Sequence, residues 1–187
     1  MTTPTLLTLV RIALIPVLAL FFYLPWELSR PVTALIFTLA AVTDWLDGYL
    51  ARKLNQTSAF GAFLDPVADK LMVAVALVLL VQANPSPWLA IPAAIIIGRE
   101  IAVSALRERM AELGKGAEVA VSMVGKVKTS SQMVAIILLL YQESLLGLPV
   151  QALGFALLYI AAGLTLWSMI LYLLRAWPAL QGPGRAS

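Results

Sequence analysis

Six long apolar stretches run through this chain of 187 residues and constrain its fold more than any other feature. A bilayer core of roughly 30 Å needs about 20 apolar residues per helix, and each stretch is close to that length. Proline, glycine or charged residues separate the stretches. We therefore predict an all-α, polytopic integral membrane protein, with six transmembrane helices in a single domain over residues 1–187. The predicted spans are 6–24, 31–51, 60–82, 87–109, 124–141 and 150–174.

The composition narrows the chemistry that is open to such a protein. Hydrophobic residues make up 61% of the chain, and its mean hydropathy is +0.91, which is too apolar for an ordinary water-dispersed domain. The chain has no cysteine and no histidine, so disulfides, thiol nucleophiles and imidazole bases are excluded. A metal ion would have to be held by oxygen atoms, which favours Mg²⁺, Mn²⁺ or Ca²⁺.

Basic residues are distributed unevenly between the two sets of connectors. The connectors at residues 25–30, 82–87 and 142–149 contain Arg30 as their one basic residue. By the positive-inside rule, the richly basic set faces the cytosol together with both termini. The net charge of +3 does not suggest nucleic-acid binding. We expect residues 111–121 to form a cytosolic loop and residues 181–187 to form a disordered tail. The basic set comprises Arg52, Lys53, Arg107, Arg109, Lys115, Lys126 and Lys128.

Four aspartates interrupt this lipid-like sequence within a short stretch. Asp44 and Asp47 end the second predicted helix, and Asp65 and Asp69 follow in the third. At 100° per residue, each pair lies on one stripe of its helix. A short connector joins the two helices, so we expect them to pack with the acidic stripes facing each other. Carboxylates are costly at membrane depth, which indicates a functional pocket just below the cytosolic surface.

The pocket is predicted to bind cations and a phosphate-containing ligand. Four carboxylates in a low-dielectric setting repel one another unless cations neutralise them, and two divalent ions would balance their charge. Gly48, Ala51 and Gly61 lie on the same stripes, so a bulky ligand can approach the backbone. Arg52 stands at the rim, where its planar guanidinium suits a phosphate.

A simpler interpretation remains open for single aspartates, which can cap helices or lie in solvated loops. Pro66 is relevant here, because proline is tolerated in a first helical turn but removes a hydrogen bond deeper in a helix. Either Asp65 caps the third helix, or the helix begins near Ser58. We favour the second arrangement, because it keeps the acidic stripe continuous.

The spacing of these residues resembles the complete signature of the CDP-alcohol phosphotransferase family. All eight specified positions match: Asp44-x-x-Asp47-Gly48-x-x-Ala51-Arg52, eight residues, then Gly61-x-x-x-Asp65-x-x-x-Asp69. The segments TLLTLVRIALIP, IGREIAVSALRE and GKVKTS extend the likeness over nearly the whole chain, towards the bacterial members that use glycerol 3-phosphate.

The resemblance implies a site, cofactors and partners. It implies a multi-pass protein of the bacterial cytoplasmic membrane, commonly a homodimer, that binds CDP-diacylglycerol with two divalent ions, either Mg²⁺ or Mn²⁺. Asp44, Asp47 and Asp65 would be metal ligands, and Asp69 would be both a ligand and the general base. The implied nucleotide contacts are Asp44, Gly48, Ala51, Arg52, Thr57 and Gly61.

By the same resemblance, the acceptor is sn-glycerol 3-phosphate, whose 1-hydroxyl attacks the lipid-linked phosphorus and releases CMP. The acceptor's own phosphate calls for a cationic cradle, for which the candidates are Arg99, Arg107, Lys126 and Lys128. The lysines could instead enforce topology or contact anionic lipid, and Arg99 could simply pair with Glu100. Arg11 is expected to touch a lipid phosphate or to reach the cytosolic interface.

Three other functions remain open. Cardiolipin, phosphatidylserine and phosphatidylinositol-phosphate synthases share the same signature and differ in their acceptor. A membrane prenyltransferase also uses aspartates to hold magnesium and diphosphate, but its two motifs usually lie far apart. A divalent-cation transporter would also place carboxylates in the membrane, but its polar groups should cross the full depth. Here the charges gather on the cytosolic side.

Overall fold

The computed structural model describes residues 3–54, 59–112, 123–143 and 147–180. Six helices account for nearly all of this part of the chain, which contains no strand. The prediction of an all-α protein with six helices is therefore confirmed. The loop predicted at residues 111–121 starts too early, because Ala111 and Glu112 belong to the helix that ends at Glu112. The rest of that loop, Thr57 and the tail 181–187 lie outside the described residues. The helices are α1 (Thr3–Tyr23), α2 (Ser29–Leu54), α3 (Ala59–Ala83), α4 (Pro87–Glu112), α5 (Met123–Tyr141) and α6 (Val150–Leu180).

Local chemistry explains where several helices begin. α4 starts at Pro87, a position where the missing backbone N–H has no helical partner to lose. The Ser86 hydroxyl caps this helix by accepting a hydrogen bond of 3.3 Å from the backbone N–H of Trp88. Pro66 lies well inside α3, which begins at Ala59. Asp65 is therefore a residue of the helix body, as the continuous acidic stripe required, and not its cap.

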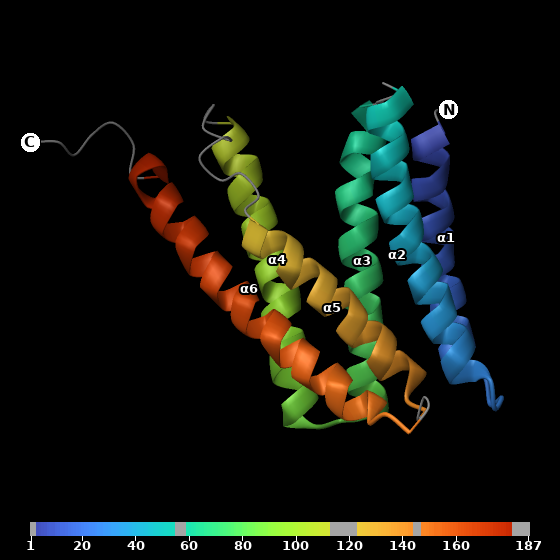
Figure 1. Ribbon diagram of the computed structural model, residues 1–187. Helices are drawn as coiled ribbons and strands as arrows, with labels where there is room; N and C mark the ends of the chain where they lie inside the picture. Colours follow the sequence, from blue (N-terminus) through green and yellow to red (C-terminus); the bar gives the residue numbers. More distant parts are fainter. Residues whose placement is uncertain (1–2, 55–58, 113–122, 144–146, 181–187) are drawn as a thin grey trace, which may run out of the picture.

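The helices form two groups that meet at one end of the molecule and separate at the other (Figure 1). α1 packs against α2 and α3, and α6 packs against α4 and α5. α5 also contacts α2 and α3, so it connects the two groups. The start of α1 and the end of α6 lie at the open end, together with the end of α2 and the start of α3 (Figure 1).

A continuous apolar core holds the two groups together where they meet. Five helices each contribute a side chain that is at most 1% exposed: Leu18, Phe37, Leu77, Ile96 and Ile136. α6 reaches α5 closely at Gly154, where a β-carbon would lie 2.9 Å from Cγ of Leu139. Such small-residue contacts are typical of helix packing in membranes.

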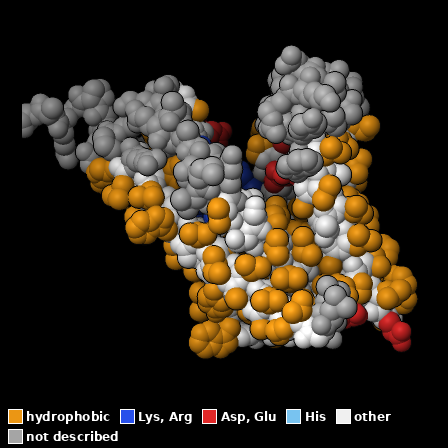
Figure 2. All heavy atoms as spheres, viewed as in Figure 1, with side chains coloured by type: hydrophobic (Ala, Val, Ile, Leu, Met, Phe, Trp, Pro, Cys, Tyr) orange, Lys and Arg blue, Asp and Glu red, His pale blue; other side chains and the backbone are white. Residues whose placement is uncertain are grey.

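Many large hydrophobic side chains are exposed on the exterior of the molecule. Large hydrophobic side chains cover much of the visible surface, whereas Lys, Arg and several acidic side chains lie around the hollow at the open end and further acidic side chains lie at the opposite end (Figure 2). Within the described residues, three helical segments are long and apolar enough to cross a bilayer: Leu6–Tyr23, Pro87–Glu112 and Val150–Leu174. An apolar surface of this extent suits lipid rather than water, so the chain is a membrane protein.

Candidate active site

Arg11 is the centre of the acidic half of the site. This residue of α1 is 1% exposed, and its Nη1 lies 3.1 Å from Oδ1 of Asp44 on α2. The same nitrogen pairs with Oδ1 of Asp69 on α3. The expected contact of Arg11 with a lipid phosphate or the interface is therefore wrong: its guanidinium joins two of the predicted site aspartates.

Asp65 is held by a different residue of the same helix. The hydroxyl of Thr8, one turn before Arg11 and fully buried, donates a hydrogen bond to Oδ1 of Asp65. α1 thus supplies a partner to both aspartates of α3. This positions the acidic stripe of α3 against α1, while Asp44 and Asp69 remain about one-third exposed.

The donor set fits hard divalent cations. Asp44 and Asp69 come from different helices and share one guanidinium, so their oxygens are close enough for cations to neutralise both. Where side chains are described, no three acidic residues converge into a complete metal site. Asp47 lies in α2 with its side chain outside the description, as do Gly48, Ala51 and Arg52. Their predicted roles stay predictions.

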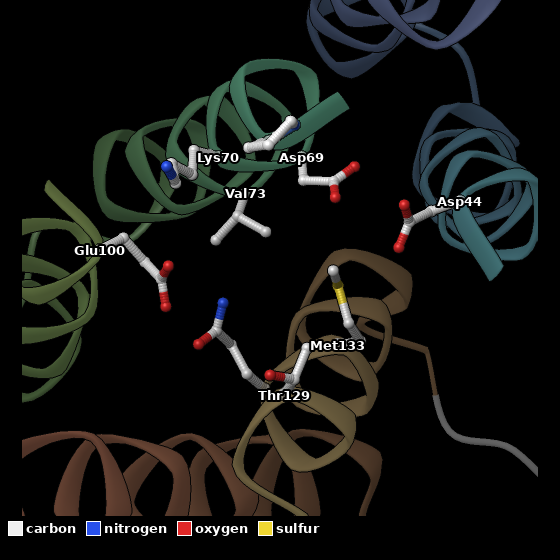
Figure 3. Close-up of a pocket in the computed structure, with 9 residues that line it drawn as sticks. Asp44, Asp69, Lys70, Val73, Glu100, Thr129 and Met133 are labelled. Carbon is white, nitrogen blue, oxygen red and sulfur yellow. The ribbon is translucent and has the colours of Figure 1, made fainter. Parts of the chain in front are cut away.

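A cavity of about 200 Å³ opens beside Asp44 and Asp69 and extends towards α4 and α5. The labelled side chains of Asp44, Asp69, Glu100 and Met133 reach into it from four different helices (Figure 3). The cavity therefore links the acidic stripes to the fourth and fifth helices, where the acceptor cradle was predicted. Its lining residues are Asp44, Pro66, Asp69, Lys70, Val73, Glu100, Thr129, Gln132 and Met133.

At the far side of this cavity, Glu100 binds two of the predicted cradle cations. Its Oε1 accepts hydrogen bonds from Lys128 Nζ at 2.7 Å and from Arg99 Nη1 at 3.1 Å. Lys128 and Arg99 are both buried, at 3% and 7% exposure. The pairing of Arg99 with Glu100 was one of the two expectations for that residue. The structure places the pair within a larger cationic cluster.

Arg107 joins this cluster through α6. Its Nη2 donates to the Tyr172 hydroxyl at 3.1 Å, and the Tyr172 ring lies 5.3 Å from the Arg107 guanidinium and 5.8 Å from that of Arg99. Arg99 Nη2 also donates to Ser168 at 3.2 Å. The buried Nε atoms of both arginines have no hydrogen-bond partner within the described residues. These donors remain available to an anion.

Three of the four predicted cradle residues therefore come together. The fourth, Lys126, belongs to α5, but its side chain lies outside the description. Sequence reasoning missed Thr8, Arg11, Glu100 and Gln132 as parts of the site. Polar groups inside apolar helices were the available signal for all four, and Arg11 and Thr8 share a face at i, i+3.

Comparisons with known proteins found a family model and relatives that match most of the chain. The family model described as CDP-alcohol phosphatidyltransferase matches residues 1–167. A protein of Pseudomonas fluorescens is 55% identical over 99% of this chain and 95% of its own length. One from Pectobacterium atrosepticum is 59% identical over 91% of this chain and 92% of its own length. Both relatives carry the name CDP-diacylglycerol–glycerol-3-phosphate 3-phosphatidyltransferase.

Proposed function

This chain belongs to the CDP-alcohol phosphatidyltransferase family, and from that premise we infer that it transfers the phosphatidyl group of CDP-diacylglycerol to sn-glycerol 3-phosphate. The products are phosphatidylglycerol phosphate and CMP, which makes the chain an enzyme of phospholipid biosynthesis. The observation that carries the choice of acceptor is the cationic cluster of Arg99, Arg107 and Lys128, two of which pair with Glu100 in the cavity wall. A neutral alcohol would need no such cluster.

The chain's own residues divide the reaction between them. Arg99, Arg107 and Lys128 hold the phosphate of the acceptor, so that its 1-hydroxyl points across the cavity towards Asp69. Asp69 accepts the hydroxyl proton as the oxygen bonds to the lipid-linked phosphorus. The bond from that phosphorus to the CMP oxygen breaks, and CMP leaves. Arg11 and Thr8 position the aspartates for these steps.

Asp44, Asp47, Asp65 and Asp69 are the residues that would hold divalent metal, either Mg²⁺ or Mn²⁺, as two ions. When bound, the metal supplies positive charge that offsets the diphosphate of the lipid substrate. Oxygen-only donors from two facing helices support this assignment. Gly48, Ala51, Arg52, Thr57 and Gly61 form the nucleotide side of the site in this proposal, with Gly61 buried at the start of α3.

The direct test offers the purified protein CDP-diacylglycerol with one acceptor at a time and measures CMP release. The acceptors are glycerol 3-phosphate, serine, inositol phosphate and phosphatidylglycerol, each with and without Mg²⁺ or Mn²⁺. Rapid metal-dependent release with glycerol 3-phosphate alone is the expected result. Faster release with another acceptor would assign the chain to a different branch of the family. No release with any acceptor would favour the cation transporter.

We also propose that all six helices cross the cytoplasmic membrane, with both termini and the active site facing the cytosol, and that the protein forms a homodimer. The basic residues near the open end support this orientation. Since the chain has no cysteine, single cysteines can report it. Glu112→Cys should react with an impermeant thiol reagent only from the cytosolic side, and Asn84→Cys only from the outer side. The reverse pattern would overturn the topology.

A further inference from the structure

Gln132 has a buried polar atom whose purpose the chain itself does not explain. It lies on α5, one turn beyond Lys128, and is only 3% exposed. Its Oε1 makes no hydrogen bond within the part of the chain that the structure describes. Buried polar atoms in folded proteins nearly always have a partner, so an orphan of this kind requires a reason. Gln132 also lines the cavity of the candidate active site, which supplies one.

The position of Gln132 relates it to the middle of the acceptor. Asp44 and Asp69 form one part of the cavity wall, and Glu100 forms another. Glu100 accepts hydrogen bonds from Lys128 and Arg99. In the proposed pose, the 1-hydroxyl of glycerol 3-phosphate lies at Asp69 and its phosphate lies at the cations. The second carbon of the acceptor then lies between these two groups. The second carbon carries a hydroxyl, which is the one polar group of the acceptor that neither end accounts for.

We propose that Gln132 recognises the 2-hydroxyl of the acceptor, which makes it a specificity-determining residue for three-carbon polyol phosphates. The proposal rests on the proposed function. The hydroxyl donates its hydrogen to Oε1 and so satisfies the buried acceptor atom. A neutral amide suits this place, because a carboxylate there would compete with the acceptor's phosphate for Lys128 and Arg99.

A substrate that lacks this hydroxyl should be a poor acceptor for the parent protein. Bound 3-hydroxypropyl phosphate has the same reactive hydroxyl and the same phosphate, but it leaves Oε1 of Gln132 unsatisfied. Sites built to hydrogen-bond a substrate hydroxyl reject analogues without it, because the buried partner is then unpaired. We expect kcat/KM for 3-hydroxypropyl phosphate to be at least about 10-fold below that for glycerol 3-phosphate.

The test measures the acceptor ratio, which is kcat/KM for glycerol 3-phosphate divided by kcat/KM for 3-hydroxypropyl phosphate, in Gln132→Met and in the parent. Methionine has nearly the shape of glutamine but no hydrogen-bonding amide, so the ratio should fall from about 10 or more to about 1. The KM for CDP-diacylglycerol should stay the same. Met133→Leu is the matched control: this neighbour also lines the cavity but makes no hydrogen bond, so it should leave the ratio at the parent value.

Thermal unfolding of the substrate-free protein separates recognition from a structural role. Because Oε1 has no partner among the described residues, Gln132→Met should unfold at the parent temperature or above it. An unchanged acceptor ratio in a folded Gln132→Met would overturn the proposal, as would a lower unfolding temperature with the ratio retained. If that variant does not fold, Gln132→Asn, which withdraws the amide, must show the same loss of discrimination. A parent that does not use glycerol 3-phosphate at all would instead refute the proposed function.

Discussion

The two halves of the candidate active site carry opposite net charges. Each net charge is opposite in sign to the ligand proposed for that half. Around α1, Asp44 and Asp69 share the guanidinium of Arg11, and Asp65 accepts a hydrogen bond from the neutral hydroxyl of Thr8. Among α4, α5 and α6, Arg99 and Lys128 share the carboxylate of Glu100, and Arg107 donates to the neutral hydroxyl of Tyr172. The first half has a surplus of negative charge for metal ions, and the second a surplus of positive charge for a phosphate. The cavity lined by Asp44, Asp69 and Glu100 connects the two halves.

The two halves are alike in that each contains an internal partner of opposite charge. In the acidic half, Arg11 offsets part of the repulsion between Asp44 and Asp69 within the chain itself. In the cationic half, Glu100 does the same for Lys128 and Arg99. Burying unpaired charge is costly, so each cluster retains one opposite charge and leaves the remainder to substrate. Predictions that break one half at a time follow from this division.

The largest effect is expected from Asp69→Asn, which disables the acidic half. The amide cannot accept the hydroxyl proton, so kcat should fall on the order of 10²-fold or more while the protein stays folded. Steady-state CMP release measures the rate, and thermal unfolding checks the fold. Glu112→Gln, on the exposed end of α4, is the control and should keep the parent rate. Near-normal turnover in Asp69→Asn would dismiss the base assignment.

Arg11→Met removes the internal cation of the acidic half. Without its guanidinium the carboxylates repel, so the unfolding temperature in a metal chelator should fall by about 5 °C, equivalent to roughly 2 kcal/mol. Added Mg²⁺ should then raise that temperature by more in the variant than in the parent, because the metal replaces the missing charge.

The matched control for Arg11 is Arg109→Met, which removes an exposed arginine that pairs only with Glu112 in the described structure. Surface pairs of this kind contribute little, so its unfolding temperature should stay within about 1 °C of the parent. If Mg²⁺ stabilises Arg11→Met and the parent equally, the acidic half does not rely on Arg11 for its charge.

A smaller and more selective effect is expected in the cationic half. Arg107→Ala removes one donor of the cluster and should raise the KM for glycerol 3-phosphate by about 10-fold, as loss of a charged hydrogen bond does. The KM for CDP-diacylglycerol should change by less than about twofold. Initial rates over a matrix of both substrates provide both constants. An unchanged acceptor KM would remove Arg107 from the cradle.

The sequence predicted the acidic half better than the cationic one, for a physical reason. Asp44 and Asp69 stand on helical stripes whose spacing can be calculated from the sequence. The expected direct packing of α2 against α3 is minor, because α1 contacts both helices far more extensively. Arg11 lies on another helix, and periodicity alone does not determine that α1 packs against α3. The partner of Arg11 therefore became visible only in three dimensions.

The cationic half depends still more on tertiary packing. Arg99 and Lys128 were recognisable as intramembrane cations, but the common partner Glu100 and the support of Tyr172 come from contacts between α4, α5 and α6. Gln132 carried even less signal, since a single amide in an apolar helix fits many roles. Only its burial, its unpartnered oxygen and its place in the cavity wall distinguish it.

The central claim is that the cationic half selects a phosphorylated acceptor while the acidic half carries out the transfer. The most direct measurement is the ratio of kcat/KM for glycerol 3-phosphate to that for glycerol, in the parent and in Lys128→Met. Lys128→Met should lower this ratio by about 10-fold or more and leave the KM for CDP-diacylglycerol unchanged. An unchanged ratio, with both acceptors slowed equally, would contradict it.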